Sequence, residues 1–161
     1  MPDKTLALYE FDGPIREMIH LFKYEDCSSF ARYFGEVLTE QVGELGVGFD
    51  AIVPIPLSKD RRAWRGYNQS LLLAKEIGKR TGIEVWEILK RKRGSESQVQ
   101  SGTKEKRQAN IRGVFETDIS IPENILLIDD VITSGATVLE ATRVLKHAGA
   151  KRVYVLALAM G

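Results

Sequence analysis

Apolar positions recur at helical spacing in several segments of this chain. In the first segment, Ile15, Ile19 and Phe22 repeat every three or four residues, and that period gathers apolar side chains on one face of a helix. The third segment is expected to end at Gly82, because glycine readily adopts the left-handed conformation that stops a helix. The predicted helices cover residues 14–24, 29–42, 68–82 and 137–149.

Short apolar runs alternate with these helices and indicate strands that are buried on both faces. The expected strands cover residues 49–56, 83–92, 113–118, 124–129 and 152–160. Strands that alternate with helices predict the α/β class, with a central parallel sheet of about five strands flanked by helices. In such sheets a ligand binds beyond the carboxyl ends of the strands.

Composition and charge narrow the class further. The chain has 161 residues, of which 43% are apolar and 28% charged, and these values are typical of one soluble globular domain. Because 23 basic residues face 22 acidic ones, the net charge of +1 identifies no partner. Cys27 is the only cysteine, which excludes a disulfide framework. The chain has no signal-peptide pattern and no apolar run near the ~20 residues that span a membrane, so we expect a cytoplasmic protein without a membrane partner.

Residues 124–141, NILLIDDVITSGATVLEA, join an apolar strand to two adjacent acids and a hydroxyl-rich turn. The strand is expected over Ile125 to Ile128, with Asp129 and Asp130 at its carboxyl end. Adjacent carboxylates repel each other and are costly to desolvate. A strand followed by an acid-capped helix would explain one of these acids, whereas a ligand that uses both explains the pair.

The turn that follows the acids has the chemistry of an anion site. Thr133, Ser134 and Thr137 supply hydroxyl groups, while Gly135 and Ala136 let the backbone approach a ligand closely. Successive N–H groups at the start of a helix bind anions, helped by the helix dipole. Paired carboxylates suit vicinal sugar hydroxyls and Mg²⁺. The stretch therefore predicts a site for a ribose 5-phosphate.

This stretch resembles the phosphoribosyl pyrophosphate (PRPP) motif of type I phosphoribosyltransferases. The resemblance implies that Asp129 and Asp130 hold the ribose hydroxyls, with Mg²⁺ at the acids or held only through the substrate, and that residues 133–137 hold the 5′-phosphate. It implies a central parallel sheet with a small hood, in a single domain over residues 1–161. Residues 1–48 would form the N-terminal helical or hood segment and residues 49–161 the PRPP-binding core.

The activity implied by this resemblance is that of an enzyme. It would transfer the phosphoribosyl group of Mg²⁺-bound PRPP to a nitrogen nucleophile with release of pyrophosphate. The sequence does not identify the small-molecule acceptor. A homodimer stays open as an alternative to a monomer.

Two further stretches are similar to the ComF-like branch of that family. They are VPIPLSKDRRAWRGYNQSLLLA at 53–74 and QSGTKEKRQANIRGVF at 100–115, and the similarity extends over about residues 10–160. The branch implies one alternative, a DNA-uptake component whose partners are DNA or the competence machinery. A PRPP- or nucleotide-binding regulator that has kept the site without turnover is a second alternative. Many members begin with a zinc-binding cysteine segment. This sequence starts where that segment would end, so the resemblance does not extend to a zinc-dependent role such as docking to DNA or a partner.

The strand end near Pro54 is a candidate pyrophosphate loop. Prolines stiffen the turn and leave the N–H groups of Ile55 and Leu57 available to point at an anion. Lys59 and Arg65 follow within reach. The alternative is a proline-bounded strand end followed by a solvated basic surface.

Residues 91–112 form a long polar segment that is rich in cations and lacks apolar periodicity. Such a segment inside a domain is usually a lid or disordered. Type I phosphoribosyltransferases have a flexible loop at this place in the chain, and the resemblance implies that this one closes over PRPP, with Lys104 and Arg107 in catalytic roles. A loop that contacts nothing, or one that contacts DNA phosphates, is the alternative.

Overall fold

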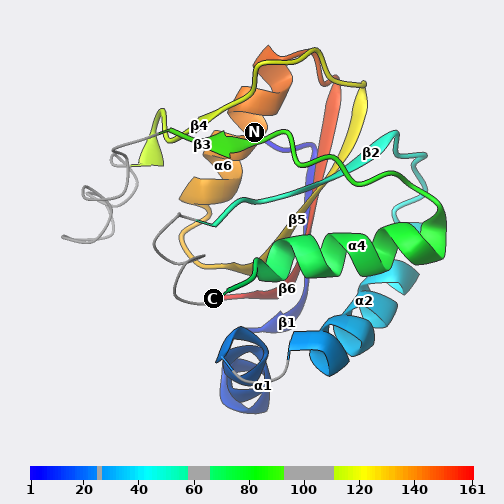
Figure 1. Ribbon diagram of the computed structural model, residues 1–161, viewed down its shortest axis with the longest axis vertical. Helices are drawn as coiled ribbons and strands as arrows, with labels where there is room; N and C mark the ends of the chain where they lie inside the picture. The colour runs from blue at the N-terminus through cyan, green and yellow to red at the C-terminus, as the bar shows by residue number, and fades with distance from the viewer. Residues whose placement is uncertain (25–26, 58–65, 93–110) are drawn as a thin grey trace.

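A four-stranded parallel sheet forms the centre of the computed structural model, which describes residues 1–24, 27–57, 66–92 and 111–161. The strand order is β1-β6-β5-β2 (Figure 1). The strands are β1 (Lys4–Glu10), β2 (Ala51–Pro54), β5 (Asn124–Ile132) and β6 (Arg152–Met160). All three pairings between neighbouring strands are parallel, so the predicted α/β class with a central parallel sheet is confirmed.

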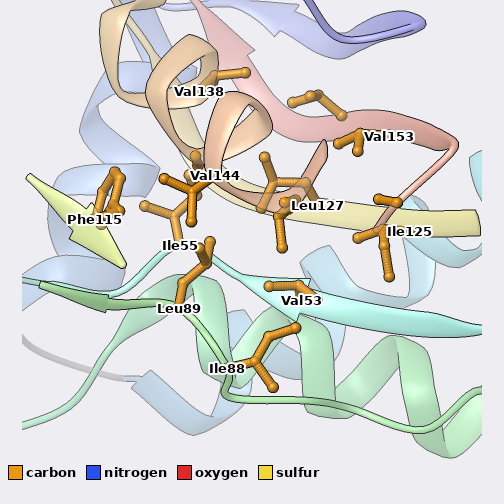
Figure 2. Packing of buried hydrophobic residues seen from close by; sticks show 14 of the residues in the cluster. Val53, Ile55, Ile88, Leu89, Phe115, Ile125, Leu127, Val138, Val144 and Val153 are labelled. Carbon is orange, nitrogen blue, oxygen red and sulfur yellow. The ribbon is translucent and has the colours of Figure 1, made fainter. Parts of the chain in front are cut away.

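Helices cover both faces of this sheet. They are α1 (Gly13–Tyr24), α2 (Cys27–Glu44), α4 (Gln69–Thr81) and α6 (Ala136–His147). Along β5, Leu126 and Ile128 pack with α1, α2 and α4, whereas Ile125 and Leu127 pack with α6 on the other face (Figure 2). Because successive side chains of a strand point to opposite faces, a strand covered on both sides needs the continuous apolar run that the sequence shows.

The packing of α2 on α4 depends on a glycine. A Cβ atom on Gly35 would collide with the side chain of Glu76, so the two helices approach closely only because Gly35 has no side chain. The N-terminus of α4 is capped by Asn68, whose side chain accepts the N–H of Ser70 at 3.1 Å. The helix ends at Gly82 with φ of 76°, as predicted. No helix in the described ranges is long and apolar enough to cross a membrane.

The strand β1 was not predicted, because residues 1–48 were expected to be helical. It pairs with β6 over the register from Lys4↔Tyr154 to Glu10↔Met160, so the start of the chain belongs to the central sheet. The assignment of the N-terminal segment as a hood stays a prediction. Among the described residues the central sheet thus has four strands in place of the expected five or so.

The strand predicted over residues 83–92 forms only at two places, so the prediction of one continuous strand was wrong. Val85 makes an isolated parallel bridge to Ile52 of β2. The next residue of β2 on that edge, Pro54, has no N–H to continue the ladder. Further on, β3 (Lys90–Arg91) pairs antiparallel with β4 (Phe115–Glu116) in a short ribbon.

Candidate functional site

A cavity of about 230 Å³ lies where β2 and β5 end and the turns after them begin. The predicted site residues Ile55, Asp129, Asp130, Thr133 and Thr137 all line it. They come from the two neighbouring strands β2 and β5 and from the segments that follow those strands. The fold therefore brings the acid pair, the hydroxyl-rich turn and the proline turn to one place. Pro56, Leu57 and Val131 also line the cavity. The rest of the wall comes from residues that the sequence did not single out as site residues: Phe11, Lys23, Gln69, Ser70 and Arg91. Arg91 was expected at the start of the lid and lies instead in β3.

Asp129 is almost buried, with 8% of its surface exposed. Its Oδ1 atom accepts the backbone N–H of Asp130 at 2.9 Å and the hydroxyl of Ser70 at 3.3 Å. Burial first, and the neighbouring charge of Asp130 second, raise the pKa of the Asp129 carboxyl well above its usual range. The ionised carboxylate of Asp129 is therefore poorly hydrated, and a bound ligand with hydroxyl or cationic groups would replace the lost hydration.

Asp130 makes an ion pair with Lys23 of α1. The Nζ atom of Lys23 lies 3.0 Å from Oδ2 of Asp130, and the two side chains are 19% and 14% exposed. The other oxygen, Oδ1, accepts the backbone N–H of Val131 at 2.7 Å. No local signal in the sequence points to Lys23, because Lys23 and Asp130 are far apart in the chain.

Asp129 and Asp130 lie inside β5, whereas the sequence had placed them at the carboxyl end of the strand. Asp129 is in register with Ala157 of β6, and pairing continues to Ile132. The strand is longer because β6 offers a partner for its last residues. The side chains of the acids still reach the cavity.

The turn after β5 leads into α6 through Gly135, which has φ of +73°. That left-handed conformation strains any residue with a side chain. The N–H of Ala136 points to the hydroxyl of Ser134 at 3.4 Å, and Thr133 and Thr137 line the cavity. The first turn of α6 has no acidic residue, so no carboxylate within that turn opposes the positive end of the helix, and this favours anion binding at the helix start.

The proline turn differs from its prediction in one respect. The N–H of Ile55 donates to the carbonyl of Ile128 at 2.9 Å, so the expectation of an available amide at Ile55 was wrong. The ladder between β2 and β5 continues one residue beyond Pro54 and uses that donor. Leu57 lines the cavity, and its predicted contact with an anion stays a prediction.

Two side chains hold the proline turn in place. The amide of Asn68 donates to the carbonyl of Ile55 at 3.0 Å, and Nε of Arg91 donates to the carbonyl of Pro56 at 3.2 Å. The guanidinium of Arg91 also lies over the ring of Phe115, with 5.0 Å from Cζ to the ring centroid. The ribbon β3–β4 thereby places a cation in the wall of the cavity.

Several predicted residues fall outside the described part of the chain. They are Lys59, Arg65, Lys104 and Arg107, together with residues 93–110 of the predicted lid. Their roles stay predictions. The described residues on either side of 93–110 are joined, because the N–H of Lys92 donates to the carbonyl of Val114 at 2.9 Å.

The acid pair can supply only part of the ligands that Mg²⁺ needs. Among the described residues no group of three or more histidine, cysteine or acidic side chains could hold a metal ion. Mg²⁺ is commonly bound by one or two carboxylates together with substrate phosphates and water. Asp129 and Asp130 therefore suit a magnesium ion that a phosphorylated substrate brings with it, and not a metal held by the protein alone.

Comparison with known proteins places this geometry in context. Residues 68–160, which include α4, β5, α6 and β6, match the phosphoribosyl transferase domain family. The matched region contains the acid pair and the turn after it, which form one side of the cavity.

Two curated relatives match almost the whole chain. The competence protein ComFC of Streptococcus pneumoniae is 28% identical over 152 residues, covering 94% of this chain and 66% of that protein. The competence protein F of Haemophilus influenzae is 29% identical over 168 residues, covering 98% of this chain and 72% of that protein. The chain thus spans about two thirds of the length of these relatives.

A solved structure shares the fold. The glutamine phosphoribosylpyrophosphate amidotransferase from B. subtilis, complexed with ADP and GMP, superimposes with a TM-score of 0.54 at 21% identity. The match covers 79% of this chain and 25% of that one. At this identity the likeness is one of fold alone.

Proposed function

This chain belongs to the phosphoribosyl transferase domain family, in its ComF-like branch, and from that premise we propose that it binds PRPP and transfers its phosphoribosyl group to a nitrogen nucleophile. One observation carries the proposal. The acid pair of β5 and the start of α6 line the same cavity, so carboxylates and an anion-binding turn are available to one ligand. A ribose 5-phosphate has the matching groups, a vicinal diol and a phosphate.

In the proposed complex, the ribose hydroxyls donate hydrogen bonds to Asp129 and Asp130. The 5′-phosphate accepts hydrogen bonds from the backbone and hydroxyls of residues 133–137. Gly135, in the left-handed conformation at the N-cap of α6, supports this role, since such a residue helps successive backbone N–H groups form an anion-binding concavity. Both sets of contacts fix the sugar ring and leave its C1 atom accessible.

The proposed reaction is a substitution at C1. The nitrogen lone pair attacks C1, the bond between C1 and the pyrophosphate oxygen breaks with its electron pair, and the nitrogen loses a proton. Positive charge develops on the sugar as this bond weakens, so nearby carboxylates stabilise the transition state while the protein positions the reactants. Bound Mg²⁺ would supply positive charge to the pyrophosphate oxygens.

Cations near the proline turn would stabilise the leaving group. Arg91 is the described candidate, because it lines the cavity and is held against Pro56. We assign Lys59 and Arg65 to the same pyrophosphate, and Lys104 and Arg107 to closure over it, from the sequence alone.

A second function is favoured by the names of the relatives. Both matched relatives are described as competence proteins. In this alternative the chain contributes to DNA uptake, and its fold mainly serves contact with protein or DNA. A regulator that binds PRPP or a nucleotide in the same cavity without turnover is a separate alternative.

A pyrophosphate-release assay tests the first function. Mg²⁺ and PRPP are supplied with a panel of nitrogen bases and amines, and we expect release that depends on one acceptor class and is lost when Asp129 and Asp130 are both changed to Asn. Asp118→Asn, on an exposed acid, is the matched control. Calorimetric binding of PRPP without release would favour the regulatory alternative. Absence of PRPP binding would reject both the transferase and the PRPP-binding regulator.

A further inference from the structure

We propose that Lys23 is a positioning residue that competes with the sugar for Asp130, so that a vicinal diol displaces its ammonium group when it binds. The inference rests on the proposed function, because it takes the acid pair as the sugar site. The contact that carries it is the 3.0 Å ion pair between Nζ of Lys23 and Oδ2 of Asp130. Both side chains are largely shielded from water, so the pair is weakly screened.

The hydrogen bonds of the acid pair show why Lys23 matters. Oδ1 of Asp129 and Oδ1 of Asp130 each accept a backbone N–H from β5, and the former also accepts the Ser70 hydroxyl. Oδ2 of Asp130 is taken by Lys23. Of the four carboxylate oxygens of the acid pair, only Oδ2 of Asp129 has no hydrogen bond or ion pair with a described residue. A vicinal diol donates two hydrogen bonds at once. We infer that one goes to Oδ2 of Asp129 and the other to Oδ2 of Asp130, where it meets the ammonium group of Lys23.

A second cavity beside Lys23 can receive its ammonium group when the ion pair with Asp130 breaks. Lys23 and Phe11 line the acid-pair cavity and also a second cavity, of about 780 Å³, that runs along α1. Arg16 and Glu17 line the second cavity as well, and Glu17 offers a negative charge on that side. A rotation of the flexible lysine side chain moves the charge from one cavity toward the other.

The backbone of α1 need not move during this exchange. Phe22, next to Lys23, is fully buried, and its carbonyl accepts the hydroxyl of Tyr67 at 3.0 Å. These contacts hold the last turn of α1 on the core. Displacement is therefore a side-chain event, and its effect should appear in the affinity for the sugar and in the reactivity of the lysine amine.

Calorimetry with ribose 5-phosphate tests the competition, using Lys23→Met, which keeps the length of the side chain and removes its charge. We expect this variant to bind ribose 5-phosphate about three- to tenfold more tightly than the unmodified protein, because no internal ion pair has to be broken. Lys23→Arg keeps the charge and should show no gain. Lys79→Met, which removes an exposed ion pair on α4, is the matched control. Equal or weaker binding by Lys23→Met would overturn the proposal.

A second measurement uses the unmodified protein and does not depend on any variant folding. An amine-acetylating reagent is applied with and without ribose 5-phosphate, and modification is read by mass spectrometry. We expect ribose 5-phosphate to increase acetylation of Lys23 at least twofold and to leave Lys79 unchanged. Protection of Lys23, or an equal increase with 2-deoxyribose 5-phosphate, which lacks the vicinal diol, would overturn displacement by the diol.

The same experiments separate failure of this inference from failure of the proposed function. Binding of ribose 5-phosphate that Lys23→Met does not strengthen rejects the role of Lys23 and leaves the sugar site standing. If neither ribose 5-phosphate nor PRPP binds to the folded protein, the proposed function is rejected and the inference with it.

Discussion

The buried carboxylate of Glu140 on α6 accepts a hydrogen bond from the backbone N–H of Gly113, with 2.7 Å between Oε1 and the nitrogen. The guanidinium of Arg143 donates two more, at 2.9 and 2.8 Å. Gly113 has φ of +79° in the turn before β4. The helix that begins at the predicted phosphate turn is thus tied to the ribbon that carries Arg91.

Changing Glu140 to Ala should lower the free energy of unfolding by about 1–3 kcal/mol, because the Gly113 N–H loses its acceptor in a buried place. Urea unfolding followed by circular dichroism measures the change. Glu123→Ala is the control, since Glu123 makes an exposed ion pair with Lys151 and should change stability by less than about 1 kcal/mol. Equal effects of the two substitutions would contradict the structural role of Glu140.

Changing Asp129 to Asn should raise stability at neutral pH. The pKa of Asp129 is raised in the folded protein, mainly by burial and then by the charge of Asp130. An acid of this kind favours folding when it is protonated, below its pKa in the unfolded chain, and this contribution is lost as the pH rises through the folded pKa. Asparagine stays neutral, so the gain should be on the order of 1 kcal/mol at pH 7 and should vanish in acid.

Thermal unfolding of Asp129→Asn and the unmodified protein between pH 3 and pH 8 checks this prediction. Asp118→Asn is the control at an exposed acid, and it should show no gain at neutral pH. A loss of stability in Asp129→Asn at pH 7 would show that the ionised carboxylate is favourable in the folded state.

The double change Asp129→Asn with Asp130→Asn should weaken binding of Mg²⁺-PRPP by several kcal/mol, since each charge-assisted hydrogen bond is worth about 1.5–3 kcal/mol. Titration calorimetry measures it, with Glu123→Gln as the surface control. An unchanged affinity for Mg²⁺-PRPP would show that the acid pair does not bind the ribose.

Gly135→Val should abolish binding of ribose 5-phosphate. The side chain is incompatible with the left-handed backbone at φ +73°, and the strain costs about 1–2 kcal/mol. Gly43→Ala is the matched control, because Gly43 lies within α2 and an added Cβ meets nothing within 4 Å. Normal binding by Gly135→Val would place the phosphate elsewhere.

Replacing Lys104, Lys106 and Arg107 with Ala should lower turnover far more than ground-state binding of PRPP, as expected for contacts made mainly in the transition state. Steady-state kinetics and calorimetry on the same variant separate the two effects. If these cations bind DNA instead, the variant should lose salt-dependent DNA affinity, with a log–log slope smaller by up to about 3 units.

The sequence alone determined the class of the fold and the central part of the candidate site, which is the acid pair with the turn after it. The run from Ile125 to Ile128 was recognisable as a strand because every residue in it is apolar, as a strand covered on both faces requires. The turn after it was recognisable because Gly135 and the hydroxyl residues around it are close in the chain. Period and turn chemistry are local properties, and local properties can be read from one sequence.

Tertiary structure decided which distant groups meet those local motifs. In the folded chain Lys23 makes an ion pair with Asp130, and the Ser70 hydroxyl donates to Asp129. The N–H of Ile55 donates to Ile128 and extends the ladder between β2 and β5. Tertiary structure also made a strand of residues 4–10, whose polar ends and short length gave no strong pattern by themselves. Such contacts join residues far apart in the chain, and they form because packing and strand pairing favour them, not because of any preference in the local sequence.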